Sequence, residues 1–201
     1  MSEPAFPRLF LASSNPGKLR EYKQLAAGSG IEIELVPNFR NLPAFDESAP
    51  TFAENAVGKA LHYSRLADGL VLADDSGLVV PALGGAPGVH SARYAGPDAT
   101  DADRIDKLLR AMEGKKGSER RARFVCVSAI AARGRALAVV SDFVDGMIGE
   151  ESRGSNGFGY DPVFQMIDTD RTYGELLSEE KNRLSHRGKS FSKLIAIFPP
   201  Q

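Results

Sequence analysis

Two adjacent carboxylates, Asp74 and Asp75, lie between two short apolar runs in residues 69–80 (GLVLADDSGLVV). An ionised carboxylate at the edge of a core is costly unless a cation, backbone N–H donors or water compensates it. The apolar runs are partly β-branched and are bounded by a glycine and a proline, which predicts two buried strands joined by a tight turn at residues 74–77. Taken alone, this stretch favours a structural turn over a catalytic centre, because Asp, Ser and Gly favour turns for local reasons.

A second polar segment, residues 13–18 (SSNPGK), lies between a predicted strand at residues 8–12 and a stretch with helical spacing of apolar side chains. Asn15 followed by Pro16 is typical of a helix N-cap and a first helical residue. The free N–H groups at such a helix end favour an anion, and Lys18 adds a positive charge. Capping alone explains the asparagine and the proline but not the two serines and the lysine. The spacing is not that of a Walker A loop.

Two aromatic residues, Phe158 and Tyr160, lie among three glycines in residues 154–164 (GSNGFGYDPVF). Glycine lets a backbone approach a ligand closely. An exposed ring beside such a backbone is a good stacking surface for a base. The alternative, a turn whose rings fill the core, is equally compatible with the pattern.

A local positive cluster, formed by Lys181, His186, Arg187 and Lys189, lies in residues 177–189. A solvated basic face is the commonest explanation for such a run. Arginine also presents a rigid fork of donors, so that a His-Arg pair can read hydrogen-bond acceptors on a base.

The elements that must position these residues begin with a long helix predicted over residues 51–67. Thr51 opens it, and Glu54 three residues later completes a capping box. Asn55 and Lys59 share one helix face, which could meet solvent or a cleft. The remaining pattern predicts strands at residues 31–36, 122–131 and 136–144, the last two as an antiparallel hairpin, and helices at residues 19–25, 99–112 and 191–198, with a short helix from Ser178 interrupted at residues 185–187.

Length and composition limit the class of protein. The chain has 201 residues, of which 42% are hydrophobic and 25% charged, which suits one domain or two lobes that share a core. Its net charge of -1 does not indicate a general nucleic-acid binder. It has no run long enough for a membrane span and no secretion signal, so we expect a cytoplasmic protein without membrane contact. The single cysteine, Cys126, excludes an intramolecular disulfide and predicts a small buried side chain.

The order of the segments along the chain is far more specific than any one of them, and it resembles the inosine triphosphate pyrophosphatase family. Seven blocks match in order, from near residue 9 to near residue 190: residues 13–18 (SSNPGK), 51–56 (TFAENA), 73–78 (ADDSGL), 85–88 (GAPG), 91–94 (SARY), 157–162 (GFGYDP) and 185–188 (SHRG).

The resemblance implies a fold and an activity. The fold would be α/β, an elongated mixed β-sheet flanked by helices, with residues 1–201 as a single domain of two lobes around a central nucleotide cleft. The activity would be Mg2+-dependent hydrolysis of non-standard purine nucleoside triphosphates (ITP, dITP and XTP). Cleavage between the α and β phosphates would release the monophosphate and pyrophosphate, which cleanses the nucleotide pool. The family also implies a homodimer.

The resemblance assigns roles by position. Asp75 would be the proton acceptor and a metal ligand, with Glu47 as a second carboxylate on the metal, although the loop that holds Glu47 matches the family less closely than the other blocks. Oxygen ligands without a Cys/His cluster suit Mg2+ rather than zinc. Residues 13–18 would hold the triphosphate with help from Lys59, and Phe158 would stack on the purine. The substrate-binding residues implied in this way are Ser13, Ser14, Asn15, Pro16, Gly17, Lys18, Ser76, Phe158, Gly159, Tyr160, Asp161, Lys181, His186 and Arg187.

The residues assigned to the purine base predict which purines are accepted. His186 and Arg187 would address the 6-keto oxygen, and a donor-only arginine favours keto purines because the amino group of adenine would stay unpaired. Donor matching does not exclude GTP, whose O6 is also an acceptor. Two alternatives stay open, a related pyrophosphatase for pyrimidine or modified triphosphates and a non-catalytic nucleotide-binding module. The sequence assigns no role to Asp74.

Overall fold

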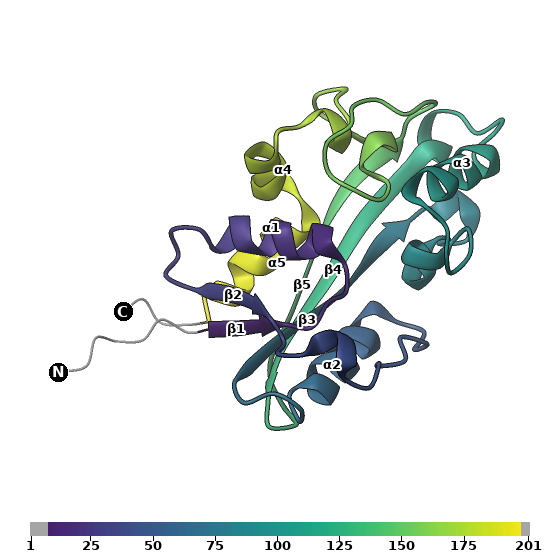
Figure 1. The fold of residues 1–201 in the computed structure, drawn as a ribbon. Helices are drawn as coiled ribbons and strands as arrows, with labels where there is room; N and C mark the ends of the chain where they lie inside the picture. Colours follow the sequence, from purple (N-terminus) through teal and green to yellow (C-terminus); the bar gives the residue numbers. More distant parts are fainter. Residues whose placement is uncertain (1–7, 198–201) are drawn as a thin grey trace. The chain divides into compact units, whose positions relative to one another are not determined.

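A mixed six-stranded sheet with flanking helices forms the frame of the computed structural model, which describes residues 8–197 (Figure 1). The strand order is β2-β1-β3-β4-β5-β6. β1 pairs in parallel with β2 and β3, whereas β5 and β6 are antiparallel. The strands are β1 (Arg8–Leu11), β2 (Glu32–Leu35), β3 (Leu70–Val79), β4 (Arg121–Ala132), β5 (Arg135–Ile148) and β6 (Phe164–Met166), and the helices are α1 (Pro16–Ala26), α2 (Phe52–Tyr63), α3 (Asp101–Ala111), α4 (Ser178–Leu184) and α5 (His186–Ile195). The predicted α/β class, with a mixed sheet flanked by helices, is confirmed.

The two adjacent carboxylates lie inside one continuous strand, so the prediction of a turn at residues 74–77 was wrong. β3 runs unbroken through them, and Gly77 does not take the left-handed conformation that such a turn would use. Its first residues pair with β1, in the register Leu9 to Leu70, and β4 is its other neighbour in the sheet. Its place between β1 and β4 in the sheet holds the strand extended and overrides the local turn preference of Asp, Ser and Gly.

The hairpin of β4 and β5 is confirmed, and its turn has a clear local cause. Arg133 and Gly134 both have positive φ, 50° and 74°. Two such residues between adjacent strands form the mirror-image turn whose twist matches that of the strands.

The chain forms two compact units. Unit 1 contains Met1–Asp75, Cys126–Asp142 and Arg187–Gln201, and unit 2 contains Ser76–Val125 and Phe143–His186. The boundary therefore falls within β3, directly after Asp75, and again within β4 and β5. The prediction of one domain of two lobes around a nucleotide cleft stays a prediction.

Unit 1 buries apolar side chains on both faces of β1 and β3. On one face, Tyr22 of α1 and Phe191 of α5 pack with Leu72 of β3. On the other face, Ala56 and other residues of α2 pack with Val71 and Ala73. Because neighbouring residues of a strand point to opposite faces, β3 serves both cores (Figure 1).

Unit 2 has a core of its own, in which the end of β3 packs against α3 and a group of aromatic side chains. Leu78 and Leu108 are fully buried there with Phe164 and Tyr173. The amphipathic face predicted for residues 99–112 is confirmed, because Ile105 and Met112 belong to the same core.

Two helix boundaries differ from their predicted positions. α2 ends at Tyr63 rather than near residue 67. The hydroxyl of Ser64 donates to the carbonyl of Leu61 there, a local bond that competes with further helix. α5 begins at His186 rather than at residue 191, so that a single extended residue, Ser185, separates it from α4. The predicted end at residue 198 lies outside the described residues.

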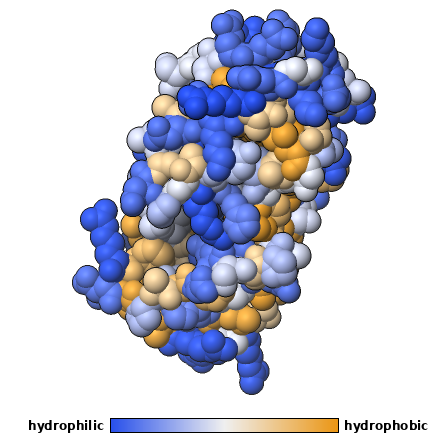
Figure 2. Space-filling view, turned by 90° about the vertical axis from the view of Figure 1, so that its right-hand side faces the viewer, coloured by the Kyte–Doolittle hydropathy of each residue, from blue (hydrophilic) through white to orange (hydrophobic). Residues whose placement is uncertain are grey.

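A membrane span requires a helix that is both long and apolar. In residues 8–197, no helix combines the length and the apolar composition needed to cross a bilayer. The face drawn in Figure 2 is mainly hydrophilic, and its apolar side chains form several separate patches. Scattered patches of this kind are normal for a folded protein.

Candidate active site

The segment predicted to hold phosphate forms the capped N-terminus of α1. The side chain of Asn15 accepts hydrogen bonds from the N–H groups of Gly17, at 2.8 Å, and of Lys18, at 3.2 Å. Pro16 is the first helical residue, as predicted. Because the cap uses these two N–H groups, an anion here would meet the exposed side chain of Ser14 and the ammonium of Lys18.

The Lys18 side chain reaches the fully buried Asp74 in β3. Its Nζ lies 3.0 Å from Oδ1 of Asp74. At the other oxygen of the same carboxylate, Nη2 of Arg187 lies 3.2 Å from Oδ2, and Nη1 of Arg187 lies 2.5 Å from Glu21. Four alternating charges therefore form one chain inside unit 1: Glu21, Arg187, Asp74 and Lys18.

The charges around Asp74 determine whether its carboxyl group is ionised. Burial alone would raise its pKa, but the nearby charges of Lys18, Arg187 and Lys59 outweigh burial and hold the pKa well below its usual range. Asp74 is therefore an anion at neutral pH and anchors Lys18 at the N-terminal end of α1.

Its neighbour Asp75 has the opposite character. Burial raises the pKa of Asp75, and the nearby Glu47 carboxylate raises it further, while Lys18, Lys59 and a hydrogen bond from Asn55 partly oppose the shift. That hydrogen bond joins Nδ2 of Asn55 to Oδ2 of Asp75 at 3.0 Å. A carboxylate with a raised pKa is a better proton acceptor. Two neighbouring acids whose pKa values are pushed apart are typical of a catalytic site.

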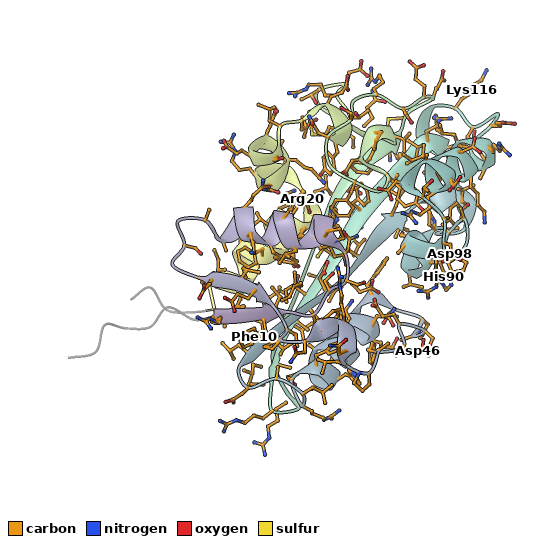
Figure 3. The ribbon with its side chains drawn as sticks, viewed as in Figure 1. Phe10, Arg20, Asp46, His90, Asp98 and Lys116 are labelled. Atoms are coloured by element: carbon orange, nitrogen blue, oxygen red, sulfur yellow. The ribbon has the colours of Figure 1, made fainter. Side chains whose placement is uncertain are left out.

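Helix α2 supplies two of these contacts from one face. Asn55 and Lys59 are both buried. Lys59 Nζ lies 3.0 Å from Oε2 of Glu47 in the loop before α2, where Figure 3 shows the neighbouring Asp46. The sequence left open whether this helix face meets solvent or a cleft, and in the structure it meets Asp75 and Glu47.

The carboxylates near Lys59 are hard oxygen donors of the kind that suit magnesium, calcium or manganese ions. In the described part of the chain, no three His, Cys, Asp or Glu side chains group as metal ligands. Mg2+ is commonly held by one or two carboxylates plus substrate phosphates and water, so it does not need such a group. Asp75 and Glu47, close enough for one to raise the pKa of the other, provide that smaller donor set.

The second cluster lies in unit 2, around Phe158. Nζ of Lys181 lies 4.9 Å from the centre of the half-buried Phe158 ring and 2.5 Å from Oδ2 of Asp161. The same carboxylate accepts the N–H of Phe158 at 2.8 Å. A Cβ on Gly157 would come within 2.0 Å of Oδ2 of Asp161, so only glycine fits there.

Several predicted site residues lie in the core or the sheet. Tyr160 is buried, and its hydroxyl donates to the carbonyl of Ser91, so the core-filling interpretation applies to its ring. His186 is buried and stacks on Phe124, with ring centres 4.6 Å apart. Ser76 is half-buried in β3.

Unit 1 brings together residues 13–18, Glu47, Lys59 and Asp75. Unit 2 brings together Phe158, Gly159, Asp161 and Lys181. The chain passes from unit 2 to unit 1 between His186 and Arg187, and Arg187 pairs with Asp74 and Glu21. The role predicted for His186 and Arg187 at the purine O6 stays a prediction.

Sequence reasoning missed Glu21 and left Asn55 without a role. Glu21 lies beside the buried Tyr22 on α1, and its partner Arg187 is 166 residues away, so no local pattern could reveal the pair. Asn55 could be found only by its position one turn before Lys59.

The fold and these clusters define an α/β protein whose polar centre suits a phosphorylated ligand. The chain belongs to the Ham1 family, whose model matches residues 9–197. It is 51% identical over 186 residues to a dITP/XTP pyrophosphatase of Geobacillus kaustophilus, covering 92% of this chain and 91% of the relative. A dITP/XTP pyrophosphatase of Bacillus licheniformis is 45% identical, with 94% and 96% covered. The solved structure of a HAM1 protein from Coxiella burnetii superposes with a TM-score of 0.84 at 41% identity and covers 95% of this chain and 98% of its own. The family resemblance seen in the sequence is confirmed.

Proposed function

We propose that this chain hydrolyses non-standard purine nucleoside triphosphates (ITP, dITP and XTP) to the monophosphate and pyrophosphate. The observation that carries the proposal is the arrangement around the adjacent pair Asp74 and Asp75: Lys18 Nζ lies 3.0 Å from Asp74, and Nδ2 of Asn55 donates to Asp75 at 3.0 Å. Its support from relatives is the 51% identity to a dITP/XTP pyrophosphatase over nearly the whole chain.

In this proposal Asp75 acts as the general base. Its carboxylate takes a proton from a water molecule as the water oxygen bonds to phosphorus, the P–O bond between the α and β phosphates breaks, and pyrophosphate leaves. The ammonium groups of Lys18 and Lys59 offset negative charge that develops on the phosphates. Asp74 takes no proton and keeps Lys18 in place.

Asp75 and Glu47 would hold Mg2+. The ion, when bound, neutralises phosphate charge and orients the attacking water. Lys59 already pairs with Glu47, so its ammonium lies beside the carboxylate that the metal would share.

At the base end, we assign the Phe158 ring to stacking on the purine. Asp161 fixes the backbone N–H of Phe158, and Lys181 lies beside the ring. Donors from His186 and Arg187 would favour a 6-keto purine over adenine, because the adenine amino group would leave them unpaired.

A substrate panel tests the function. Purified protein with Mg2+ is given dITP, XTP, dTTP and dATP, and pyrophosphate is measured separately from orthophosphate. We expect pyrophosphate from dITP and XTP far in excess of that from dATP. A preference for dTTP would overturn the base-end assignment, and orthophosphate as the product would overturn the site of cleavage.

The Asp75→Asn variant tests whether the protein is an enzyme or a nucleotide-binding module without catalytic activity. It should lose most pyrophosphate release while it still binds ITP. Unchanged turnover in this variant would refute Asp75 as the base.

We also propose a cytoplasmic homodimer that acts on small nucleotides rather than on nucleic acid or membranes. Sedimentation at micromolar concentration should give twice the monomer mass, and a monomer would contradict the proposal.

A further inference from the structure

The loop that carries Phe158 is held by carboxylates from two directions. We call residues 157–161 the stacking loop. Inside it, Asp161 accepts the N–H of Phe158 at 2.8 Å. From outside it, Asp101 at the start of α3 accepts the N–H of Gly159 at 2.7 Å. Two consecutive backbone N–H groups therefore each bind a side-chain carboxylate.

These two bonds fix the backbone on both sides of the Phe158 Cα atom. Peptide groups are planar, so a bond to the N–H of Phe158 orients the peptide before this Cα, and a bond to the N–H of Gly159 orients the peptide after it. With both planes held, φ and ψ of Phe158 are set. The direction of the Phe158 ring then follows from a choice among a few rotamers.

Packing restrains the outer side of the stacking loop very little. A surface hollow of about 520 Å³ lies there, and its lining includes Asp101, Ile105, Asn156, Phe158 and Gly159. Gly159 has φ of +62°, and apart from Gly159 itself and its two chain neighbours, no residue has an atom within 4 Å of the position that a Cβ would occupy. The hydrogen bond from the Gly159 N–H to Asp101 therefore restrains this side from outside the loop, and within the loop the Asp161 N–H donates to the carbonyl of Phe158 at 3.3 Å.

Asp101 is itself well anchored. It is the first residue of α3, where the positive end of the helix dipole favours an acidic side chain. Arg104, one turn later, forms an ion pair with it. The same arginine also donates to the carbonyl of Ala92 at 2.9 Å and to that of Ala99. The carboxylate that holds Gly159 is thus part of a rigid helix end.

We infer that Asp101 is a positioning residue for the purine base, which acts through the Gly159 N–H on the Phe158 ring. The inference rests on the proposed function, because it gives the stacking loop a base to hold. Asp101 does not touch the substrate, and its influence is confined to the base. Binding of the phosphates, which the proposal places on unit 1, is independent of it.

The test compares Asp101→Ala with a matched change in the same helix. Asp106 is another acid of α3. It forms an ion pair with Arg110 in the same helix and lines the same hollow, so Asp106→Ala is the control. For Asp101→Ala we expect the KM for dITP and the dissociation constant for inosine monophosphate to rise about fivefold to tenfold, the net effect of one hydrogen bond. The kcat and the inhibition constant of pyrophosphate should stay within twofold of wild type. Asp106→Ala should match wild type in all four quantities.

Rescue separates positioning from a merely structural role. Asp101→Asn keeps an acceptor oxygen for the Gly159 N–H and should restore most of the binding of inosine monophosphate. Asp101→Ser leaves the N-cap Thr100 in place but is too short to reach Gly159, so it should behave like Asp101→Ala and replaces it if the alanine variant does not fold. The Gly159 amide proton should exchange faster in the serine variant than in the asparagine variant.

Each outcome decides between the two proposals. If wild type cleaves dITP but Asp101→Ala and Asp101→Ser keep its KM, the inference about Asp101 is overturned and the proposed function stands. A rise in the inhibition constant of pyrophosphate as large as that in KM would also overturn the inference. If wild type neither cleaves dITP nor binds inosine monophosphate, the proposed function itself fails.

Discussion

The ammonium of Lys18 lies 3.0 Å from Oδ1 of Asp74, a carboxylate with no exposed surface. This pair links the first turn of α1 to the middle of β3. Asp74 also pairs with Arg187, so a single anion holds two cations. Its neighbour Asp75 is thereby left as the carboxylate whose pKa is raised rather than lowered.

Replacing Asp74 by asparagine should destabilise the protein strongly. The change leaves Lys18 and Arg187 without their shared anion, and removing one partner of a buried pair typically costs about 3–5 kcal/mol. Urea unfolding at pH 7 measures this loss of free energy. Asp145→Asn, which breaks an exposed pair with Arg123, is the control and should cost about 1 kcal/mol or less.

The difference in free energy of unfolding between wild type and Asp74→Asn should depend on pH in one direction. The pKa of Asp74 is lower in the folded than in the unfolded protein, so its stabilising effect is complete above the unfolded pKa of about 4 and is lost as pH falls towards the folded value. The stability gap between wild type and Asp74→Asn should therefore be constant from about pH 5 to pH 8 and should narrow only in acid. A gap that narrows near pH 7 would contradict the assignment.

Asp75→Asn should have the opposite effect on stability. The raised pKa of Asp75 means that burying its ionised form costs free energy at neutral pH, and a neutral amide removes that cost. We expect the variant to be at least as stable as wild type in urea at pH 7 and nearly inactive. Loss of stability comparable to that of Asp74→Asn would show that the two carboxylates do not have separate roles.

Asn55→Ala should move the acid limb of the pH–rate profile to higher pH. The hydrogen bond from Asn55 lowers the pKa of Asp75, so its removal raises that pKa, and the base is then deprotonated only at higher pH. The profile of kcat/KM for dITP measures the shift, and its position does not depend on how much active protein is present. Asn41→Ala, at an exposed asparagine, is the control. If the acid limb stays in place or moves to lower pH, Asn55 does not lower the pKa of the catalytic base.

Much of this local structure could be predicted from the sequence, because its causes are local. Asn15 and Pro16 determine the start of α1 through the cap, and Arg133 with Gly134 closes the hairpin. The strand through Asp74 and Asp75 could not be predicted in this way. Its turn-forming residues are held extended by pairing with other strands, and that pairing is not encoded within the stretch itself.

In the candidate site too, some residues could be predicted from the sequence and others depend on contacts between distant segments. The family pattern identified Asp75 and Phe158 as residues of interest, and the structure gives each a distinct environment. The pairing of Arg187 with Glu21 joins residues far apart in the sequence, and the hold of Asp101 on Gly159 depends on where α3 begins. Such partners are set by the fold rather than by spacing, so periodicity could not reveal them.

Phe158→Ala should weaken binding of the purine by about 1–3 kcal/mol, the usual contribution of one stacked base. The dissociation constant of inosine monophosphate measures this change, and Phe158→Tyr should retain most of the affinity. Phe143→Ala removes a more exposed ring from β5, in the same unit, and serves as the control. Unchanged affinity in Phe158→Ala would favour the interpretation that the ring only fills space in the stacking loop.

Glu47→Gln tests the proposed metal ligands, because it removes one negative charge at nearly constant volume. We expect the Mg2+ concentration for half-maximal activity to rise at least about tenfold, while activity at saturating Mg2+ recovers in part. Freed from its partner Glu47, Lys59 would still lie near the phosphates, so the KM for dITP at saturating Mg2+ should change little. Asp46→Asn is the matched control: it is the neighbouring acid in the same loop, exposed and bonded to the Ser48 hydroxyl (Figure 3). An equal Mg2+ requirement in Glu47→Gln and wild type would leave Asp75 as the single protein ligand in the proposal, and an equal rise in Asp46→Asn would mean that the charge of the whole loop, not Glu47 itself, attracts the ion.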